Sequence, residues 1–186
     1  LAFAKLEKSL VEVSVEPTLI PVGLLMANVD GPMNAVSVEG NFVGHTLYYG
    51  QGAGSHPTAS AVVADIIDAC GTINTLKGME QVKINPEITD HPDYTLMRKE
   101  DVVSGHYMRL EVSDKPGVLS EITGILASQN VSVDRFFQEK SEDSNAEIIL
   151  LTHICSYGKI VEVVDMLINL ENVKGKPVVF LSLIHI

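Results

Sequence analysis

The chain has 186 residues, with 13 Lys and Arg against 24 Asp and Glu, so its formal net charge is −11 at pH 7. Hydrophobic residues make up 46% and charged residues 20% of the chain, a composition that builds a buried core and excludes a disordered protein. The absence of a basic stripe disfavours nucleic-acid binding. The longest stretch without charged residues, 40–64, is rich in glycine and polar residues, so it does not predict a membrane span.

Residues 1–54 are predicted to form largely antiparallel β structure. Valine alternates with polar residues over 11–16, which is the period of a half-buried strand. Pro17 ends that strand because proline has no N–H to donate. Two further strand-like runs, 35–39 and 44–49, flank a Gly-Asn turn and predict a hairpin.

From Pro57 the apolar residues recur with the period of a helix, for which Ser55 is the predicted cap and Gly71 the predicted stop. The predicted apolar face consists of Ala59, Val62, Val63, Ile66, Ile67 and Cys70. Residues 72–104 lose this periodicity and are predicted to be a connector between two domains.

Residues 105–184 predict a second domain with a clear order of elements. Strand-like and helix-like periods follow one another as strand, helix, strand, strand, helix, strand. This is the βαββαβ order of a ferredoxin-like fold, with four antiparallel strands and two helices on one face. A unit of this size is only marginally stable alone, so we expect it to associate with a neighbour or with a copy of itself.

A glycine-rich turn between the predicted hairpin and the predicted helix is the densest candidate binding feature. Gly50, Gly52 and Gly54 alternate with Gln51 and Ala53. Glycines let the backbone approach a ligand closely, and the start of a helix offers unpaired N–H groups to a phosphate or carboxylate. The same turn is also compatible with a tight connection that binds nothing, and the residues alone leave both interpretations open.

Three segments in order, 17–21, 25–35 and 49–65, resemble the homoserine dehydrogenase family. The resemblance covers residues 1–71 and implies the C-terminal part of the family's catalytic and dimerisation region, ending in the helix that returns to the nucleotide domain. It implies that Gly52, Ala53 and Gly54 lie beside the nicotinamide end of NAD(P) in the full-length enzyme.

The resemblance also implies that the catalytic groups lie upstream of Leu1. These groups are the nucleotide-binding glycine loop, the catalytic lysine and the acidic residues that hold homoserine. Charged residues such as Lys5, Glu12 and Glu16 are spread along the first strands as on a solvated face and do not replace them. Because the chain also begins without Met, we expect a fragment that has no catalytic residue, binds no cofactor and shows no dehydrogenase activity.

The second candidate site is the turn between the first strand and the first helix of the βαββαβ unit. Pro116 pre-sets the turn and Gly117 supplies a backbone without Cβ, so that N–H groups can face a small carboxylate. Together with the element order and Asn130, this turn resembles the ACT domain, an amino-acid-sensing module. The resemblance implies that Asn130 lies near this effector site across a subunit interface and that the site itself is lined by Asp114, Lys115, Pro116, Gly117, Val118 and Leu119. The alternative is a structural turn in a dimerisation unit.

Neither the histidines nor the cysteines predict a metal site. The six histidines have no metal-ligand spacing: His45, His56, His91, His106, His153 and His185. Cys70 and Cys155 are far apart, and each lies in an apolar run. We expect both to be buried free thiols in a reducing cytoplasm.

The expected fold is α+β, with a partial antiparallel sheet and one long helix followed by the ferredoxin-like ACT domain. The expected function is that of a part of homoserine dehydrogenase, which interconverts L-homoserine and L-aspartate 4-semialdehyde with NAD(P) in threonine, methionine and isoleucine biosynthesis. Feedback by threonine or a related amino acid, assembly into a homo-oligomer such as a dimer, and a cytoplasmic location are expected with it. The alternative is a stand-alone ACT-type regulator that binds amino acids and oligomerises without catalysis.

Overall fold

The computed structural model describes residues 1–76, 93–140 and 144–184. The chain divides into two compact units. The first unit joins Leu1–Pro21 to Pro92–Ile186, and the second unit comprises Val22–His91. The first unit is therefore built from two stretches of chain that are far apart in sequence.

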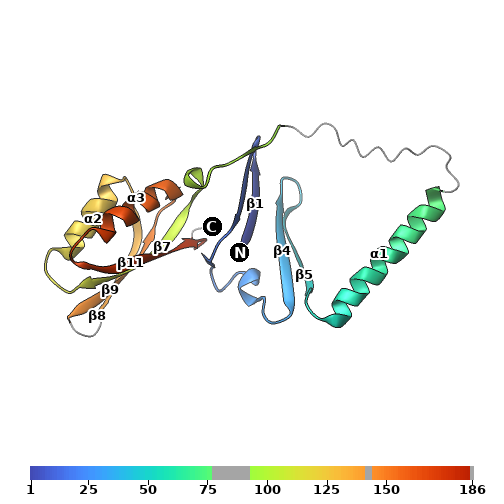
Figure 1. The fold of residues 1–186 in the computed structure, drawn as a ribbon, viewed down its shortest axis with the longest axis horizontal. Helices are drawn as coiled ribbons and strands as arrows, with labels where there is room; N and C mark the ends of the chain where they lie inside the picture. Colours follow the sequence, from blue (N-terminus) through green and yellow to red (C-terminus); the bar gives the residue numbers. More distant parts are fainter. Residues whose placement is uncertain (77–92, 141–143, 185–186) are drawn as a thin grey trace. The chain divides into compact units, whose positions relative to one another are not determined.

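The predicted βαββαβ order is confirmed in the first unit (Figure 1). Its sheet has the strand order β11-β7-β9-β8, and each of these neighbouring pairs is antiparallel. The helices α2 and α3 cover one face of this sheet. The elements are β7 (Val103–Ser113), α2 (Val118–Ser128), β8 (Val133–Lys140), β9 (Asn145–Thr152), α3 (Tyr157–Ile168) and β11 (Val173–Ser182).

Alternation along the strands and helical spacing along the helices build one core between sheet and helices. Met108, Leu110 and Val112 are alternate residues of β7 and are at most 1% exposed. They pack in one cluster with Ile122 of α2 and Ile160 of α3, which are equally buried. The alternation along β7 therefore predicted which of its faces is buried.

The N-terminal stretch adds strands that the sequence did not predict to lie here. β1 (Ala2–Glu7) and β2 (Leu10–Val15) form an antiparallel hairpin, and the short β6 (Thr95–Leu96) pairs with β2 in parallel. After Pro17, β3 (Thr18–Leu19) pairs in parallel with β11 and extends the main sheet at its edge. The main-chain bonds are Leu181 N–H to the Pro17 carbonyl at 3.3 Å and Leu183 N–H to the Leu19 carbonyl at 2.9 Å.

Two short elements complete the first unit. A turn of 3₁₀ helix, η2 (Lys99–Asp101), precedes β7, and β10 (Cys155–Ser156) pairs with the start of β7 just before α3. The Tyr157 N–H donates to the Val102 carbonyl at 2.8 Å. These contacts order the end of the predicted connector, of which residues 77–92 lie outside the described residues.

The second unit contains the predicted hairpin and the predicted helix. β4 (Met33–Gly40) and β5 (Gly44–Gln51) pair in antiparallel register, which confirms the hairpin, and a 3₁₀ turn, η1 (Leu25–Asn28), precedes them. The helix α1 (Ser55–Leu76) does not stop at Gly71, so that prediction is wrong. A glycine inside a helix costs about 1 kcal/mol, which weakens a helix without ending it.

Among the described residues, nothing covers the apolar face predicted for α1. Val62, Val63, Ile66 and Ile67 are 52–64% exposed. Cys70 on the same helix is exposed as well, so the prediction that both cysteines are buried holds only for Cys155. Among the helices of the described residues, none is long and apolar enough to cross a membrane.

Candidate functional site

The turn between β7 and α2 places the predicted effector residues on one short segment. Gly117 caps the start of α2 with φ +95°, a left-handed conformation that L side chains rarely adopt. An added Cβ would meet no atom within 4 Å, so backbone conformation, rather than lack of space, requires glycine here. Val118 is buried in the core, and the other predicted residues of the turn are exposed: Asp114, Lys115, Pro116, Gly117 and Leu119.

Main-chain hydrogen bonds hold this turn in one shape. The Asp114 N–H donates to the Ser144 carbonyl at 2.8 Å, and the Lys115 N–H donates to the Ser113 carbonyl at 2.9 Å. Leu119 stands in the first turn of α2, where N–H groups have no partner within the helix. The turn is therefore ordered and exposed, and the main-chain N–H groups at the start of α2 can donate hydrogen bonds to a carboxylate.

Asn130 lies at the other end of α2 from this turn. It has φ +54° and is exposed just beyond the helix. Thirteen steps of helical rise from Gly117 to Asn130 correspond to roughly 20 Å. One copy of the chain therefore does not bring Asn130 to the turn, and a role for it at the effector site requires a second copy.

The glycine-rich turn of the second unit joins β5 to α1. A Cβ on Gly52 would collide with the side-chain amide of Asn34, and Gly54 has φ +112°. The Gly54 carbonyl accepts hydrogen bonds from the N–H of Thr58 at 3.2 Å and from its hydroxyl at 2.8 Å. Gly52, Ala53 and Gly54 are all exposed. They form a surface with few side-chain atoms directly before the start of α1.

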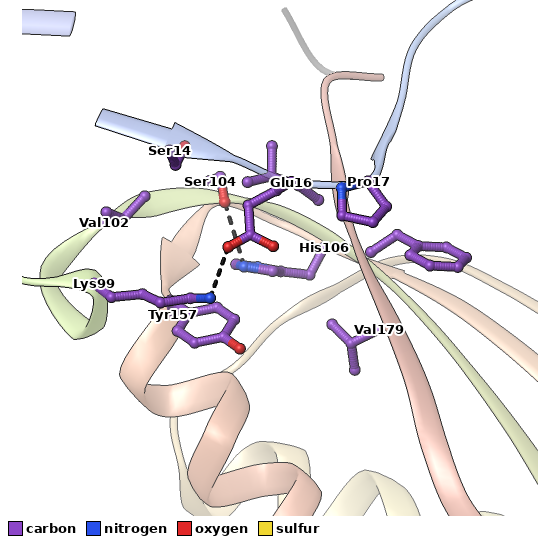
Figure 2. A pocket seen from close by; sticks show the side chains of 11 residues that line it. Ser14, Glu16, Pro17, Lys99, Val102, Ser104, His106, Tyr157 and Val179 are labelled. Atoms are coloured by element: carbon purple, nitrogen blue, oxygen red, sulfur yellow. Dashed lines mark hydrogen bonds and ion pairs between the residues drawn. The ribbon is translucent and has the colours of Figure 1, made fainter. Parts of the chain in front are cut away.

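A pocket of about 80 Å³ lies elsewhere in the first unit, where the N-terminal strands meet the main sheet (Figure 2). The sequence did not predict it, because its walls come from stretches far apart in the chain. The lining residues are Ser14, Glu16, Pro17, Lys99, Val102, Ser104, His106, Tyr157, Val179, Phe180 and Leu181.

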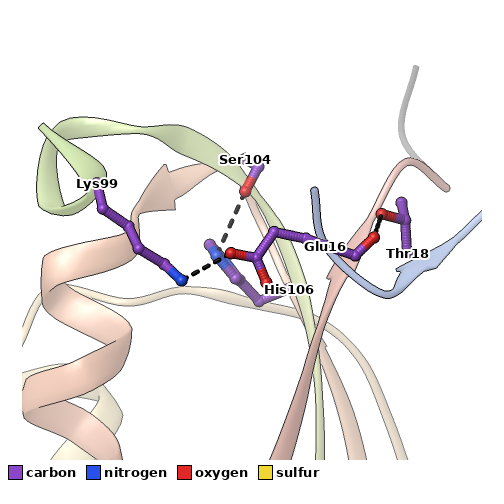
Figure 3. Close-up of polar contacts among 5 residues, drawn as sticks. All are labelled: Glu16, Thr18, Lys99, Ser104 and His106. Carbon is purple, nitrogen blue, oxygen red and sulfur yellow. Dashed lines mark hydrogen bonds and ion pairs between the residues drawn. The ribbon is translucent and has the colours of Figure 1, made fainter. Parts of the chain in front are cut away.

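An ion pair joins two of these stretches (Figure 3). The Nζ atom of Lys99 lies 2.6 Å from Oε1 of Glu16 and 4.8 Å from the centre of the Tyr157 ring. The hydrogen bond to Glu16 raises the pKa of Lys99 above its usual value, so its ammonium group stays charged. The Thr18 hydroxyl donates to the main-chain carbonyl of Glu16 at 2.9 Å. Glu16 is thus a pocket residue rather than part of the solvated face that the sequence predicted.

His106 is the buried polar side chain of this pocket. Its residue is 1% exposed, and burial lowers its pKa to about 4. Nε2 lies 3.3 Å from Oγ of Ser104, and Nδ1 lies 3.7 Å from Sγ of Cys155. Burial also raises the pKa of the Cys155 thiol. At neutral pH both groups are uncharged, so the inner part of the pocket adds no charge to the Lys99–Glu16 pair.

The predicted sites and the pocket are separate places in the chain. The effector turn lies at the far end of β7 from His106, and the glycine-rich turn belongs to the second unit. From the sequence, His106 was predicted only to be one of six histidines without metal-ligand spacing. Its place in a strand between Ser104 and the apolar Met108 was a signal that it points inward, but nothing in the sequence indicated its neighbours.

Comparison with known proteins gives two family matches. Residues 2–67 match the family described as homoserine dehydrogenase, and residues 106–172 match the ACT domain. A homoserine dehydrogenase of Neisseria gonorrhoeae is 44% identical over 146 residues, which are 77% of this chain and 33% of the relative. A homoserine dehydrogenase of Pseudomonas aeruginosa is 39% identical over 184 residues, which are 96% of this chain and 42% of the relative.

A solved structure agrees with these relatives. The crystal structure of a homoserine dehydrogenase from Thiobacillus denitrificans is similar with a TM-score of 0.85 and 39% identity. The similarity covers 97% of this chain and 41% of the solved one. The chain thus spans between a third and about two fifths of the length of these three proteins.

Proposed function

From the premise that residues 2–67 belong to the homoserine dehydrogenase family and residues 106–172 to the ACT domain family, we propose the activity of the whole protein. It interconverts L-homoserine and L-aspartate 4-semialdehyde with NAD(P), in the biosynthesis of threonine, methionine and isoleucine. The support is the 39% identity to a homoserine dehydrogenase along 96% of this chain. This chain contributes a part of that protein.

The glycine-rich turn is the proposed cofactor-side surface. NAD(P) supplies hydride transfer when it is bound. Gly52, Ala53 and Gly54 fit beside a nicotinamide ring because they are exposed and offer little side-chain bulk, and because Gly52 already lies against Asn34. In this proposal the three residues form a wall that orients the ring and take no part in proton transfer.

The 186-residue chain alone is expected to show no dehydrogenase activity. Hydride transfer needs the cofactor and a positioned proton-transferring group in one site, and the turn offers only glycines, Gln51 and an alanine, none of which transfers a proton. The measurement is the nicotinamide absorbance during incubation of purified chain with L-homoserine and NAD or NADP, with a full-length homoserine dehydrogenase assayed in parallel. Turnover by the chain above that of buffer would contradict the expectation.

The ACT domain is the proposed regulatory part. The turn Asp114–Leu119 binds the carboxylate of threonine or a related amino acid through main-chain N–H groups at the start of α2, and Asn130 of a second copy completes the site. The roughly 20 Å between Gly117 and Asn130 within one chain supports a shared site. Feedback then requires that the amino acid favour one arrangement of the paired domains over another.

Replacement of Gly117 by alanine is expected to weaken L-threonine binding by about tenfold. The φ of +95° at Gly117 is strained for alanine, so the turn shifts and loses charge-assisted hydrogen bonds worth about 1.5–3 kcal/mol. Gly124→Ala is the control, because Gly124 lies within α2 and an added Cβ meets no atom within 4 Å. Titration calorimetry measures both variants. Equal affinity in Gly117→Ala and the unmodified chain, or no binding to the unmodified chain, would refute the effector site.

A cytoplasmic, homo-oligomeric protein is proposed with this function. Cys70 and Cys155 are free thiols, which supports a reducing compartment. Sedimentation measured with and without L-threonine distinguishes a domain that senses the amino acid from a domain that only holds two copies of the chain together. The coding sequence upstream of Leu1 separates the enzyme from a stand-alone ACT regulator, because only the enzyme needs a nucleotide-binding glycine loop there.

A further inference from the structure

The mouth of the pocket carries one charge of each sign. Among the described residues that line it, Lys99 is the cation and Glu16 is the anion. Their side chains are 56% and 32% exposed, so the pair faces solvent. Ion pairs at such exposed positions contribute only about 0–1 kcal/mol, and opening this one to admit a ligand therefore costs little.

The wall of the pocket holds a hydroxyl group that lacks a partner. Oγ of Ser14 is buried and is the one buried side-chain polar atom of the described residues that makes no hydrogen bond. A buried hydroxyl without a partner costs roughly 1–3 kcal/mol. Ser14 and Glu16 both line the pocket, so a ligand bound there lies beside this hydroxyl group.

The rest of the pocket is uncharged, largely apolar and small. Val102, Val179 and Leu181 line it, and His106 at its base is neutral at physiological pH. A volume of about 80 Å³ admits several water molecules or one small metabolite. A ligand with two or more negative charges would meet a single cation there and the Glu16 carboxylate beside it.

We propose that this pocket binds a small aliphatic α-amino acid in its zwitterionic form. The ligand's ammonium group replaces Lys99 at the Glu16 carboxylate, and its carboxylate accepts from Lys99. The aliphatic side chain lies against Val102, Val179 and Leu181. The proposed site is distinct from the effector turn, because the eight residue steps along β7 from His106 to Asp114 span about 25 Å.

Ligand binding at this pocket would tie together two parts of the chain. Glu16 lies in the segment that matches homoserine dehydrogenase, and His106 and Tyr157 lie in the segment that matches the ACT domain. A ligand held by both segments stabilises their contact by mass action. This inference goes beyond the effector site of the proposed function and does not depend on it.

The test is a titration of the 186-residue chain with L-valine, followed by the methyl NMR signals of its labelled valines and leucines. Val102, Val179 and Leu181 report on the pocket, and Val118 and Leu119 report on the effector turn in the same spectra. Two control ligands each keep one of the charges of valine: 3-methylbutanoate lacks the ammonium group, and 2-methylpropylamine lacks the carboxylate. Lys99→Met keeps the aliphatic stem without the charge, and Ser14→Ala removes the unpaired hydroxyl.

L-Valine is expected to shift the pocket signals in a saturable way at millimolar concentration. Each single-charge ligand is expected to bind at least about tenfold more weakly than L-valine. Lys99→Met and Ser14→Ala should both weaken the L-valine shifts, whereas Gly117→Ala should leave them unchanged. The proposal is overturned if the pocket signals stay constant, if 3-methylbutanoate binds as well as L-valine, or if only Val118 and Leu119 respond. The last result would leave the effector site standing, and shifts confined to the pocket would leave this proposal standing without it.

Discussion

Ile122→Ala is expected to lower the free energy of unfolding of the first unit by about 2–5 kcal/mol. Ile122 is 0% exposed, lies in the middle of α2 and packs in the cluster that joins the helices to the sheet. The variant loses the burial of three carbon atoms and leaves a cavity that the surrounding strands cannot fill. Because a domain is typically stable by only about 5–15 kcal/mol, this single change removes a large part of the total.

Urea unfolding followed by the methyl signals of Leu110 and Leu150 measures this loss within the first unit, since both residues belong to the same core. Ile122→Val should cost about 0.5–1.5 kcal/mol. Leu119→Ala is the matched control on the same helix, because Leu119 is 40% exposed and its truncation leaves no closed cavity. Equal losses for Ile122→Ala and Leu119→Ala would contradict the packing described for α2.

The second large effect is a loss of stability in acid that depends on His106. The pKa of His106 is about 4 in the folded chain and about 6.5 in an unfolded one. Between these two values the unfolded chain binds more protons, so the free energy of unfolding falls as the pH falls. The contribution of His106 is fully present at pH 7 and declines from about pH 6.5 to about pH 4, by up to about 3 kcal/mol in total.

His106→Gln removes this titration, so the measurement is the difference between the two chains. Urea unfolding across this pH range, followed by the same methyl signals, should show a steeper loss for the unmodified chain. All other residues are the same in both chains, so their contributions cancel in the difference. His153→Gln, at an exposed histidine of the same unit, serves as the control and should keep the steep profile. A slope unchanged by His106→Gln would show that His106 is not buried as a neutral group.

The elements that the sequence predicted are those with a long, regular pattern. Met108, Leu110 and Val112 alternate in β7, and the apolar positions of α2 and α3 recur with a helical period, so the order of the βαββαβ unit and the buried face of β7 were predictable. The end of α1 was not, because Gly71 weakens the helix without stopping it.

The two-residue strands and the pocket escaped prediction for a different reason. β3 and β6 are too short to show a period, and their strand conformation comes from pairing with β11 and β2. Glu16 and Lys99 are 83 residues apart, and each alone looks like an ordinary surface charge. Only the fold brings them within hydrogen-bond distance, so no local pattern could have revealed the pocket.

The parallel pairing of β3 with β11 has a practical consequence for any shortened version of this protein. A piece beginning at residue 105 would keep the whole βαββαβ order, yet it would lose Pro17 and Leu19, whose carbonyls accept from Leu181 and Leu183. The end of β11 at Leu181 and Ser182 would then be an open template for pairing between molecules, which favours aggregation. The stretch Leu1–Pro21 thus covers this end of the sheet edge. The smallest piece expected to stay soluble and folded on its own therefore includes this stretch, although it is distant in sequence from the βαββαβ unit.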